Sequence, residues 1–360
     1  MSLPIGIDGG LAVTGAALVL PPDAPGGRAQ WPGGPPDDWF DHRTRLGPRG
    51  YKYLPAAAQY LLAAARGAAA DGGGIDLVPE DRRGSALALN GALAGLFDRM
   101  DRQVAAEGGA NALSPATAPY FAASVLGSRL AAEHGLKGFA LTLAAPGTAA
   151  LEAVEAGARA LAAGRCDALF VGAAEHALPK GAGEPGEQGA AALVLEPPAA
   201  AEARGAAVHG LVRARSLHVP PRSLAEGAGR ARLTATVTGA LDRLLAAAGP
   251  GARAPEPHYV LDGSPVAALT RAAVDGVLAI RPAAPPTPGA LAPGAPPGAV
   301  PLGAGSLAAA VGLVRLVTGE PGDRLLVVAG GRGHIAFVLL SALGRPPVRP
   351  HGPEREGNPC

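Results

Sequence analysis

The order of hydrophobic and polar positions predicts strands and helices that alternate along most of the chain. Short apolar runs between turn-forming residues indicate buried strands, at 11–20, 85–89, 139–145, 168–171, 190–195, 207–219, 259–261, 324–329 and 335–340. Helical periodicity and good helix formers indicate helices, at 54–70, 91–106, 121–134, 148–163, 230–248, 266–278 and 306–317. This alternation predicts an α/β fold with a mostly parallel sheet covered by helices.

Turn-forming residues predict irregular segments between these elements. The segments rich in Pro, Gly and polar residues are 21–50, 111–120, 172–189, 197–202 and 282–301. Residues 345–360 have the composition of a disordered tail. The order of elements after residue 200 repeats the order before it, which indicates an internal duplication. We therefore expect an N-terminal half at 1–200, a C-terminal half at 201–344 and a tail at 345–360.

The stretch from Gly138 to Glu175 predicts a strand, a sharp turn, a helix and a second strand. The turn lies at the N-terminus of the helix, where free backbone N–H groups and the helix dipole favour an anion, an oxyanion or a thiolate. Many enzymes carry a nucleophile at such a turn. Here the turn consists of Ala145, Pro146, Gly147 and Thr148, so it offers no Cys or Ser.

Charge and cysteine content narrow the function classes. The 31 Lys and Arg residues nearly balance the 30 Asp and Glu residues, which removes the electrostatic case for binding nucleic acid or an anionic membrane surface. Cys166 and Cys360 are far apart in the sequence, so we expect no disulfide framework and a reducing compartment. The N-terminus lacks a basic region and no long apolar run is free of helix breakers, so we expect no signal peptide, no membrane span and a cytoplasmic protein.

The remaining candidate residues give little support to cofactor or metal chemistry. Neither of the glycine-rich stretches GAGSLAAAVG and GGRG follows a strand with the Lys and Ser of a phosphate-binding loop, and no HExxH, CxxC or carboxylate cluster occurs. We therefore expect no cofactor and no metal. Cys166 is interpreted as a small buried packing residue. His334 is interpreted as a polar cavity residue or as an exposed or backbone-bonded one, and His258 as a strand-edge residue.

Several segments, taken in order, resemble the β-ketoacyl synthases of the thiolase fold. The most specific is GFALTLAAPGTAALEAVEAGARALAAGRCDALFVGAAEHA, which is similar to the nucleophile segment of that family. The weaker matches are LAVTGAALVLP, LPAAAQYLLAAARGAAADGG, SPATAPYFAASVLGSRLAAEHGLKG, HYVLDGSP, GAGSLAAAVGLVRLV and VVAGGRGHIAFVLL. The resemblance covers about residues 10 to 342 and implies a duplicated thiolase-like fold with α/β/α/β/α layers.

The resemblance also implies that the family's catalytic positions are degenerate in this chain. The nucleophilic Cys falls on Gly147, the first His on Gly263 or Asp262, and the second His on Ser306. The Lys before the second His falls near Pro301, and the gating Phe of the lid on Ala329. Decarboxylative condensation needs a thiolate for the acyl chain and two His for the developing charges. We therefore expect no catalytic residue of the family's kind.

Degenerate members of this family include the chain-length factors of type II polyketide systems. By resemblance, the chain would be a non-catalytic subunit that forms a heterodimer with an active ketosynthase, is visited by an acyl carrier protein and helps to wall the cavity for the growing chain. The compact factors of reducing, polyene-forming systems resemble it better than those of aromatic pathways.

The same resemblance places a short segment at the subunit interface, near the acyl tunnel. Its candidate residues are Ala116, Thr117, Tyr120, Phe121 and Ser124. Tyr120 and Phe121 are adjacent aromatics in a chain with few aromatic residues, and they are interpreted as the floor of the chain cavity or as ordinary packing.

Two alternatives stay open at this point. The chain could be an independent thiolase-fold acyltransferase, which would require Asp262, Ser306 and His334 to converge in one pocket. It could instead be a homodimeric pseudoenzyme that serves only as a scaffold.

Overall fold

The computed structural model describes residues 10–22, 30–31, 39–72, 74–145, 147–177, 186–225, 227–249, 253–282, 300–302 and 305–344. The strands are β1 (Leu11–Val19), β2 (Gln30–Trp31), β3 (Arg83–Ala88), β4 (Ala140–Leu143), β5 (Ala168–Glu175), β6 (Gly186–Glu187), β7 (Gly189–Glu196), β8 (Gly210–His218), β9 (Glu256–Leu261), β10 (Val300–Pro301), β11 (Gly322–Ala329) and β12 (His334–Ala342).

The α-helices are α1 (His42–Arg45), α2 (Ala56–Gly72), α3 (Ala94–Glu107), α4 (Val125–His134), α5 (Ala149–Ala162), α6 (Pro198–Ala203), α7 (Gly227–Ala246), α8 (Pro265–Ala279) and α9 (Leu307–Thr318). The short 3-10 helices are η2 (Ile75–Leu77), η3 (Glu80–Arg82), η4 (Ala110–Ala112), η5 (Pro115–Phe121) and η6 (Pro221–Ala225).

The main sheet consists of two halves with the same strand order. From one edge, the strands of the first half follow the order β4-β3-β5-β7-β1 and those of the second half, from the other edge, β10-β9-β11-β12-β8. The first three strands of each series are parallel, and the next two are antiparallel to their neighbours. The predicted duplication is therefore confirmed in the strand topology.

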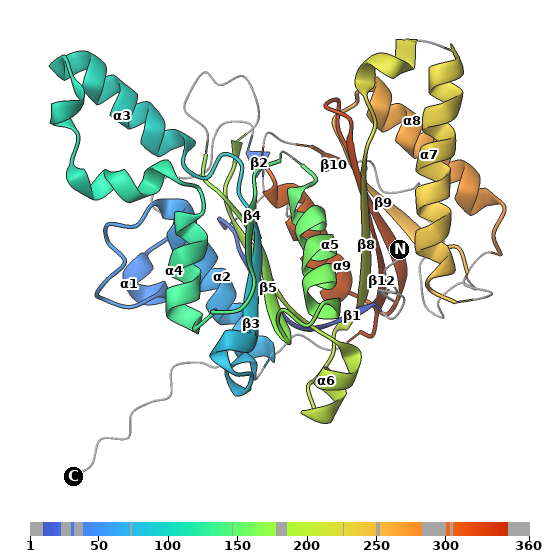
Figure 1. The fold of residues 1–360 in the computed structure, drawn as a ribbon, viewed down its shortest axis with the longest axis horizontal. Coiled ribbons are helices and arrows are strands. Elements are labelled where there is room, and N and C mark those ends of the chain that lie inside the picture. Colours follow the sequence, from blue (N-terminus) through green and yellow to red (C-terminus); the bar gives the residue numbers. More distant parts are fainter. Residues whose placement is uncertain are drawn as a thin grey trace.

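The two half-sheets meet along a short seam and then separate. Leu11–Val13 of β1 pairs with Gly210–Val212 of β8, and beyond these residues β1 pairs only with β7. Helices α5 and α9 lie between the separated half-sheets and contact strands of both, while α2 and α4 cover the first half-sheet and α7 and α8 the second (Figure 1). This arrangement gives the expected α/β/α/β/α layers.

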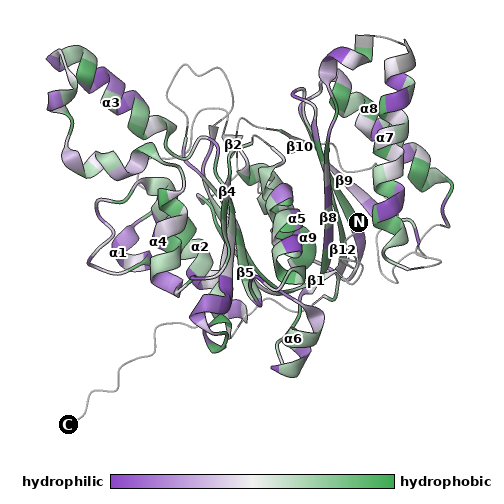
Figure 2. Cartoon of the chain, in the orientation of Figure 1, coloured by the Kyte–Doolittle hydropathy of each residue, from purple (hydrophilic) through white to green (hydrophobic). Residues whose placement is uncertain are grey.

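Small and apolar residues build the central layer. Along α5 the buried Leu151, Val154 and Leu161 recur with helical spacing, so one face of the helix enters the core. A Cβ on Gly157 would lie 2.1 Å from Leu169 Cδ2, so glycine is needed there for the close approach of α5 to β5. Hydrophobic residues dominate α5, α9 and the strands around them, whereas α3 and α7 carry many hydrophilic ones (Figure 2).

Several boundaries differ from the sequence predictions. β5 continues to Glu175 because its last residues pair with β7, although the Gly and Ala content of 172–175 suggested a connection. Residues 198–203 form α6 where only punctuation was expected, and two short elements, β2 and α1, occur within the predicted loop 21–50.

The predicted helix 121–134 is also shorter than expected. It begins at Val125, and the 3-10 helix η5, which contains Pro119, precedes it. Most of the predicted irregular segment 282–301 and the predicted tail 345–360 lie outside the described residues.

Candidate functional site

The sharp turn between β4 and α5 is present, and a glycine stands at its tip. Gly147 is buried and has a φ of 78°, in the left-handed region that favours glycine. Its N–H donates a hydrogen bond to the carbonyl oxygen of Gly305 at 2.8 Å. The next residue, Thr148, donates its hydroxyl to Glu152 Oε1 at 2.7 Å. The frame for a nucleophile is therefore kept without a side chain at its tip.

Leu302 fills the space that a side chain at Gly147 would need. A Cβ on Gly147 would lie 2.6 Å from Leu302 Cδ1 and 2.8 Å from Leu302 Cδ2. Leu302 follows β10, and its N–H donates to the carbonyl oxygen of Leu261, at the end of β9, at 2.9 Å. Real Cβ contacts are not as short as these, so even an alanine at position 147 requires Leu302 to move.

Asp262, one of the two candidates for the first catalytic His position, ties two turns together. Its carboxylate accepts hydrogen bonds from the N–H groups of Ser264, at 3.0 Å, and Gly331. Partial burial acts to raise the pKa of Asp262, but the hydrogen bonds from Ser264 and Gly331 outweigh it and leave the pKa below its ordinary value. Asp262 is thus an ionised acceptor within the fold. The other candidate, Gly263, has a φ of 76° and open space around it.

Ser306, at the second His position, is bound to a buried carboxylate. Its N–H and its hydroxyl both donate to Glu175 Oε1, at 2.9 and 2.8 Å. Glu175 also accepts from the N–H groups of Asn90 and Gly91 at 2.8 and 2.6 Å. Burial raises the pKa of Glu175, although these hydrogen bonds oppose the shift. Glu175 therefore joins the ends of β3 and β5 to the start of α9.

The remaining two family positions lie within strands. Pro301 belongs to β10 and pairs with Leu261 of β9. Ala329 is fully buried at the end of β11, between Leu261 of β9 and Ile335 of β12. Neither position offers a cationic or aromatic side chain.

The three residues of the acyltransferase alternative have separate partners. Asp262 binds Ser264 and Gly331, and Ser306 binds Glu175. His334 Nδ1 lies 3.5 Å from Glu152 Oε1, and its ring packs edge-on against His218 with the centroids 5.0 Å apart. None of the hydrogen bonds found among the described residues links these three into one proton-transfer chain.

Cys166 is buried, and burial raises the pKa of its thiol to about 11. His258 is half-buried, with its Nε2 3.6 Å from Glu256 Oε2, and burial lowers its pKa. Neither residue contacts the turn at Gly147 in any interaction found among the described residues.

The interface candidates lie on an exposed arm formed by α3, η4 and η5 (Figure 1). Phe121 is 65% exposed and stacks on Phe97 with ring centroids 6.1 Å apart, while Tyr120 is half-buried against the outer core of the first half. Ala116 and Ser124 are exposed, and Thr117 is half-buried and donates its hydroxyl to Ser114 O at 2.7 Å.

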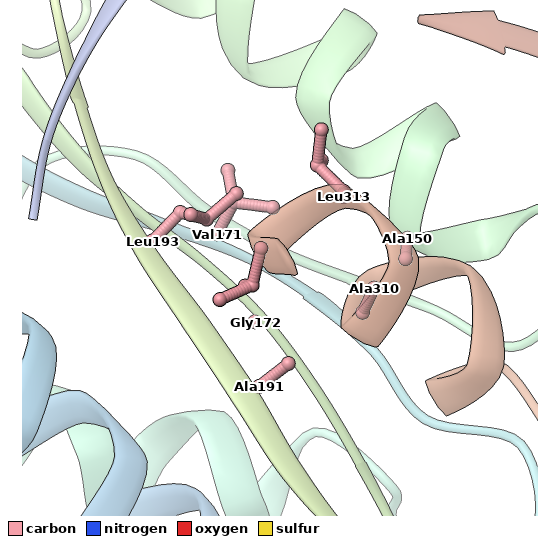
Figure 3. A pocket seen from close by; sticks show the side chains of 8 residues that line it. Ala150, Val171, Gly172, Ala191, Leu193, Ala310 and Leu313 are labelled. Carbon is pink, nitrogen blue, oxygen red and sulfur yellow. The ribbon is translucent and has the colours of Figure 1, made fainter. Parts of the chain in front are cut away.

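A small apolar void lies in the central layer, away from the polar groups of the turn. Its free space for the centre of a water-sized sphere is about 10 Å³, and Figure 3 shows aliphatic side chains around it. The lining comes from α5, β5, β7 and α9 and includes Ala150, Val171, Leu193, Ala310 and Leu313. With an almost wholly apolar lining it offers nothing to orient a substrate.

The described residues contain no group of three His, Cys, Asp or Glu side chains placed to hold a metal ion. In the same part of the chain, no helix combines the length and the apolar character needed to cross a membrane.

Sequence reasoning missed Leu302, Glu152, Glu187 and His218. Glu187 accepts from the N–H of Leu307 at 2.8 Å and thereby supports the start of α9. The four missed residues come from segments that are distant from one another in the sequence, and none of the four belongs to a motif with a fixed spacing. Glu175 ends the stretch that predicts the strand, turn and helix, but its hydrogen bonds could not be predicted from the sequence.

Solved structures with a similar fold come from polyketide systems. A type II polyketide synthase acyl-carrier protein in complex with its ketosynthase bound to the hexaketide aligns with a TM-score of 0.69 and 16% identity, over 93% of this chain and 99% of that one. The ishigamide ketosynthase/chain length factor aligns with a TM-score of 0.64 and 21% identity, over 93% and 100%. An oxazolomycin ketosynthase domain from Streptomyces albus JA3453 aligns with a TM-score of 0.59 and 17% identity, over 93% and 96%.

These structural alignments establish the fold, which is the expected thiolase-like one. No curated protein matches the sequence. Residues 21–217, more than half of the chain, match the family described as beta-ketoacyl synthase, N-terminal domain. The chain therefore belongs to the β-ketoacyl synthase family.

Proposed function

We propose that this chain is the non-catalytic, chain-length-factor-like subunit of a type II polyketide or related acyl-elongating synthase. The observation that carries the proposal is the closed turn, where Gly147 replaces a nucleophile and Leu302 fills the space beside it. An acyl thioester at this turn would need both a thiolate and room for the acyl group. The chain has neither, so condensation requires another subunit.

The polar residues around the turn support the same proposal. Two proton-handling groups are needed to stabilise the enolate and the oxyanion of a decarboxylative condensation. Gly263 or Asp262 stands at the first of these positions and Ser306 at the second, and Asp262 and Ser306 serve as hydrogen-bonding partners within the fold. The strand-turn-helix fold is therefore present without the nucleophile and the two His residues. This combination supports a subunit whose role is to pair with another chain and to shape a cavity.

An open strand edge supports pairing with a second chain. Among the described residues, β4 is the last strand of the sheet on its side and pairs only with β3. An unpaired edge is a template for another strand, and the arm also exposes small and apolar residues, Phe121 among them. We propose an active ketosynthase as the partner, which would form a heterodimer with this surface.

In that heterodimer, Tyr120 and Phe121 would form part of the floor of the chain cavity. A packed aromatic floor limits the length of the chain because a rigid wall does not stretch to admit another unit. An acyl carrier protein would deliver the extender units. One structural relative is named as a type II polyketide synthase acyl-carrier protein in complex with its ketosynthase, which supports a partner of this class.

The test is reconstitution with a ketosynthase that has an intact Cys and two His. We expect the two chains to co-purify, and we expect malonyl elongation to a defined product only when both are present. The same product from the ketosynthase alone would refute the proposal. Measurable acyl loading of this chain alone would favour the acyltransferase alternative. A stable homodimer that does not bind the ketosynthase in analytical ultracentrifugation would favour the scaffold alternative.

A matched pair of variants tests the pairing surface. Phe121→Lys places a charge on the proposed interface, whereas Leu77→Lys places the same charge on another exposed hydrophobic residue. We expect Phe121→Lys to lower the heterodimer fraction and Leu77→Lys to leave it unchanged. Equal effects of the two variants would contradict this interface.

A further inference from the structure

Two histidines lie opposite each other on the neighbouring strands β8 and β12. His218 ends β8, His334 begins β12, and the antiparallel register pairs the two residues directly. The N–H of Val219 donates to the carbonyl oxygen of Gly333 at 2.8 Å, so the next pair along the ladder, His218 and His334, is a non-hydrogen-bonded pair, in which side chains lie closest. The two imidazole rings have their centroids 5.0 Å apart and their planes inclined at 67°.

Both histidines lie on the face of the second half-sheet that packs against α5. Side chains alternate between the two faces of a strand, so His218 shares its face with Ser216, whose hydroxyl donates to Glu155 of α5. Glu152 lies three residues before Glu155 in the same helix, and its Oε1 is 3.5 Å from His334 Nδ1. His218 is exposed and His334 is half-exposed, so the histidine pair is open to solvent beside the first turn of α5.

One nitrogen of each ring faces an acceptor. His218 Nε2 lies 3.2 Å from the carbonyl oxygen of Arg332, and because a carbonyl oxygen only accepts, this bond places the proton on Nε2 and a lone pair on Nδ1. The carboxylate of Glu152 likewise favours a proton on His334 Nδ1, which leaves the lone pair on Nε2. No interaction found among the described residues engages His218 Nδ1 or His334 Nε2. The pair therefore offers two free lone pairs.

This arrangement matches that of histidines that bind metal ions. A ligating imidazole usually donates its other N–H to a carboxylate or a backbone carbonyl, which fixes the tautomer and the orientation of the ring. Two imidazoles that bind one ion at N–metal distances of about 2.0–2.1 Å have centroids about 4.5–5.2 Å apart, for angles of about 90–109° at the ion. The observed separation of 5.0 Å lies within this range.

The donor atoms select the kind of ion. Imidazole nitrogens suit Zn²⁺, Ni²⁺ and Cu²⁺, whereas Mg²⁺ and Ca²⁺ need oxygen ligands. The described residues contain no group of three His, Cys, Asp or Glu side chains placed to hold a metal ion, so the pair would supply two ligands. Water would take the other positions of a tetrahedral ion.

We propose that His218 and His334 form a binding site for a divalent transition-metal ion of the Zn²⁺ class. Glu152 and the carbonyl of Arg332 orient the two rings and are not ligands themselves. The bound ion would link the last residue of β8 to the first residue of β12 and so hold the two strand ends together. The inference does not depend on the proposed function, because it uses only the geometry of this pair.

The test measures binding of Zn²⁺ to the untagged full chain by isothermal titration calorimetry. We expect a site that takes one ion per chain, that Ni²⁺ competes for and that Mg²⁺ does not occupy. His218→Ala and His334→Ala should each abolish this site, whereas His42→Ala, which removes an imidazole from α1, should leave its affinity unchanged. Glu152→Gln should weaken the affinity about tenfold, since partners that orient a ligand typically contribute about 10–100-fold.

A urea denaturation curve without metal shows for each variant that the chain is folded, so a loss of binding reports on the site. Zn²⁺ binding that survives both histidine variants would refute the proposal. An equal loss in His42→Ala would show that the ion does not bind at the pair, and equal affinity for Mg²⁺ would identify an oxygen site instead. Unchanged affinity in Glu152→Gln would overturn the orienting role of Glu152.

Discussion

Replacing Gly147 by alanine tests the closed turn directly. The substitution adds one Cβ at a φ of 78°, which costs about 1–2 kcal/mol for a residue other than glycine. The same Cβ would lie 2.6 Å from Leu302 Cδ1, and overpacking of this kind costs about 1–3 kcal/mol. We therefore expect Gly147→Ala to lower the free energy of unfolding by about 2–5 kcal/mol, measured by urea denaturation.

A second glycine provides the matched control. Gly263 has nearly the same backbone conformation, with a φ of 76°, but a Cβ there would meet no heavy atom within 4 Å. Gly263→Ala should therefore show the backbone cost alone, about 1–2 kcal/mol. The difference between the two alanine variants isolates the contact with Leu302.

A double-mutant cycle completes the measurement. In a Leu302→Ala background the steric part should disappear, so Gly147→Ala should cost about 1–3 kcal/mol less there than in the wild-type chain. If Gly147→Ala costs no more than Gly263→Ala, or if the cycle shows no coupling, Leu302 does not fill the turn and the main support for the proposed function is lost.

Three further predictions concern the residues around the turn. Gly147→Cys should give no condensation of malonyl units by the chain without its partner, because no His stands at Asp262, Gly263 or Ser306, the candidates for the two His positions; a new condensation product would overturn the proposal of a non-catalytic subunit. Glu175→Ala should lower the free energy of unfolding by about 3–5 kcal/mol in urea denaturation, because two buried backbone N–H groups and one part-buried N–H group lose their acceptor; a loss below about 1 kcal/mol would contradict the structural role. The pKa of Asp262 is lowered in the folded chain, so its contribution is present above the ordinary value of 3.8 and is lost as the pH falls through the lower folded value; the stability difference between wild type and Asp262→Asn should therefore shrink in acid, and a difference that grows would refute the sign.

The frame of the site could be predicted from the sequence because local patterns encode it. The apolar run before Ala145, the Pro-Gly pair and the helical spacing of Leu151, Val154 and Leu161 together specify strand, turn and helix. The absence of Cys and Ser at the tip is visible in the same residues. The repeated order of elements also predicted the duplicated fold that the strand topology confirms.

Some element boundaries could not be predicted, since pairing overrides weak local preferences. Gly172 and Ala174 have little preference for a strand, yet both extend β5 because their backbones pair with β7. Pro197 and Pro198 predict an irregular segment at 197–202, where the structure has α6. Pro is well tolerated in the first turn of a helix, and α6 begins at Pro198.

By itself, then, the sequence determined the layered fold, the turn and the missing nucleophile. The tertiary structure alone decided that Leu302 closes the turn and that Glu175 holds Ser306. The physical reason is the range of the interactions. Periodicity and turn chemistry act between neighbours in the chain, whereas these contacts join segments that only the packing of the two half-sheets around α5 and α9 brings together.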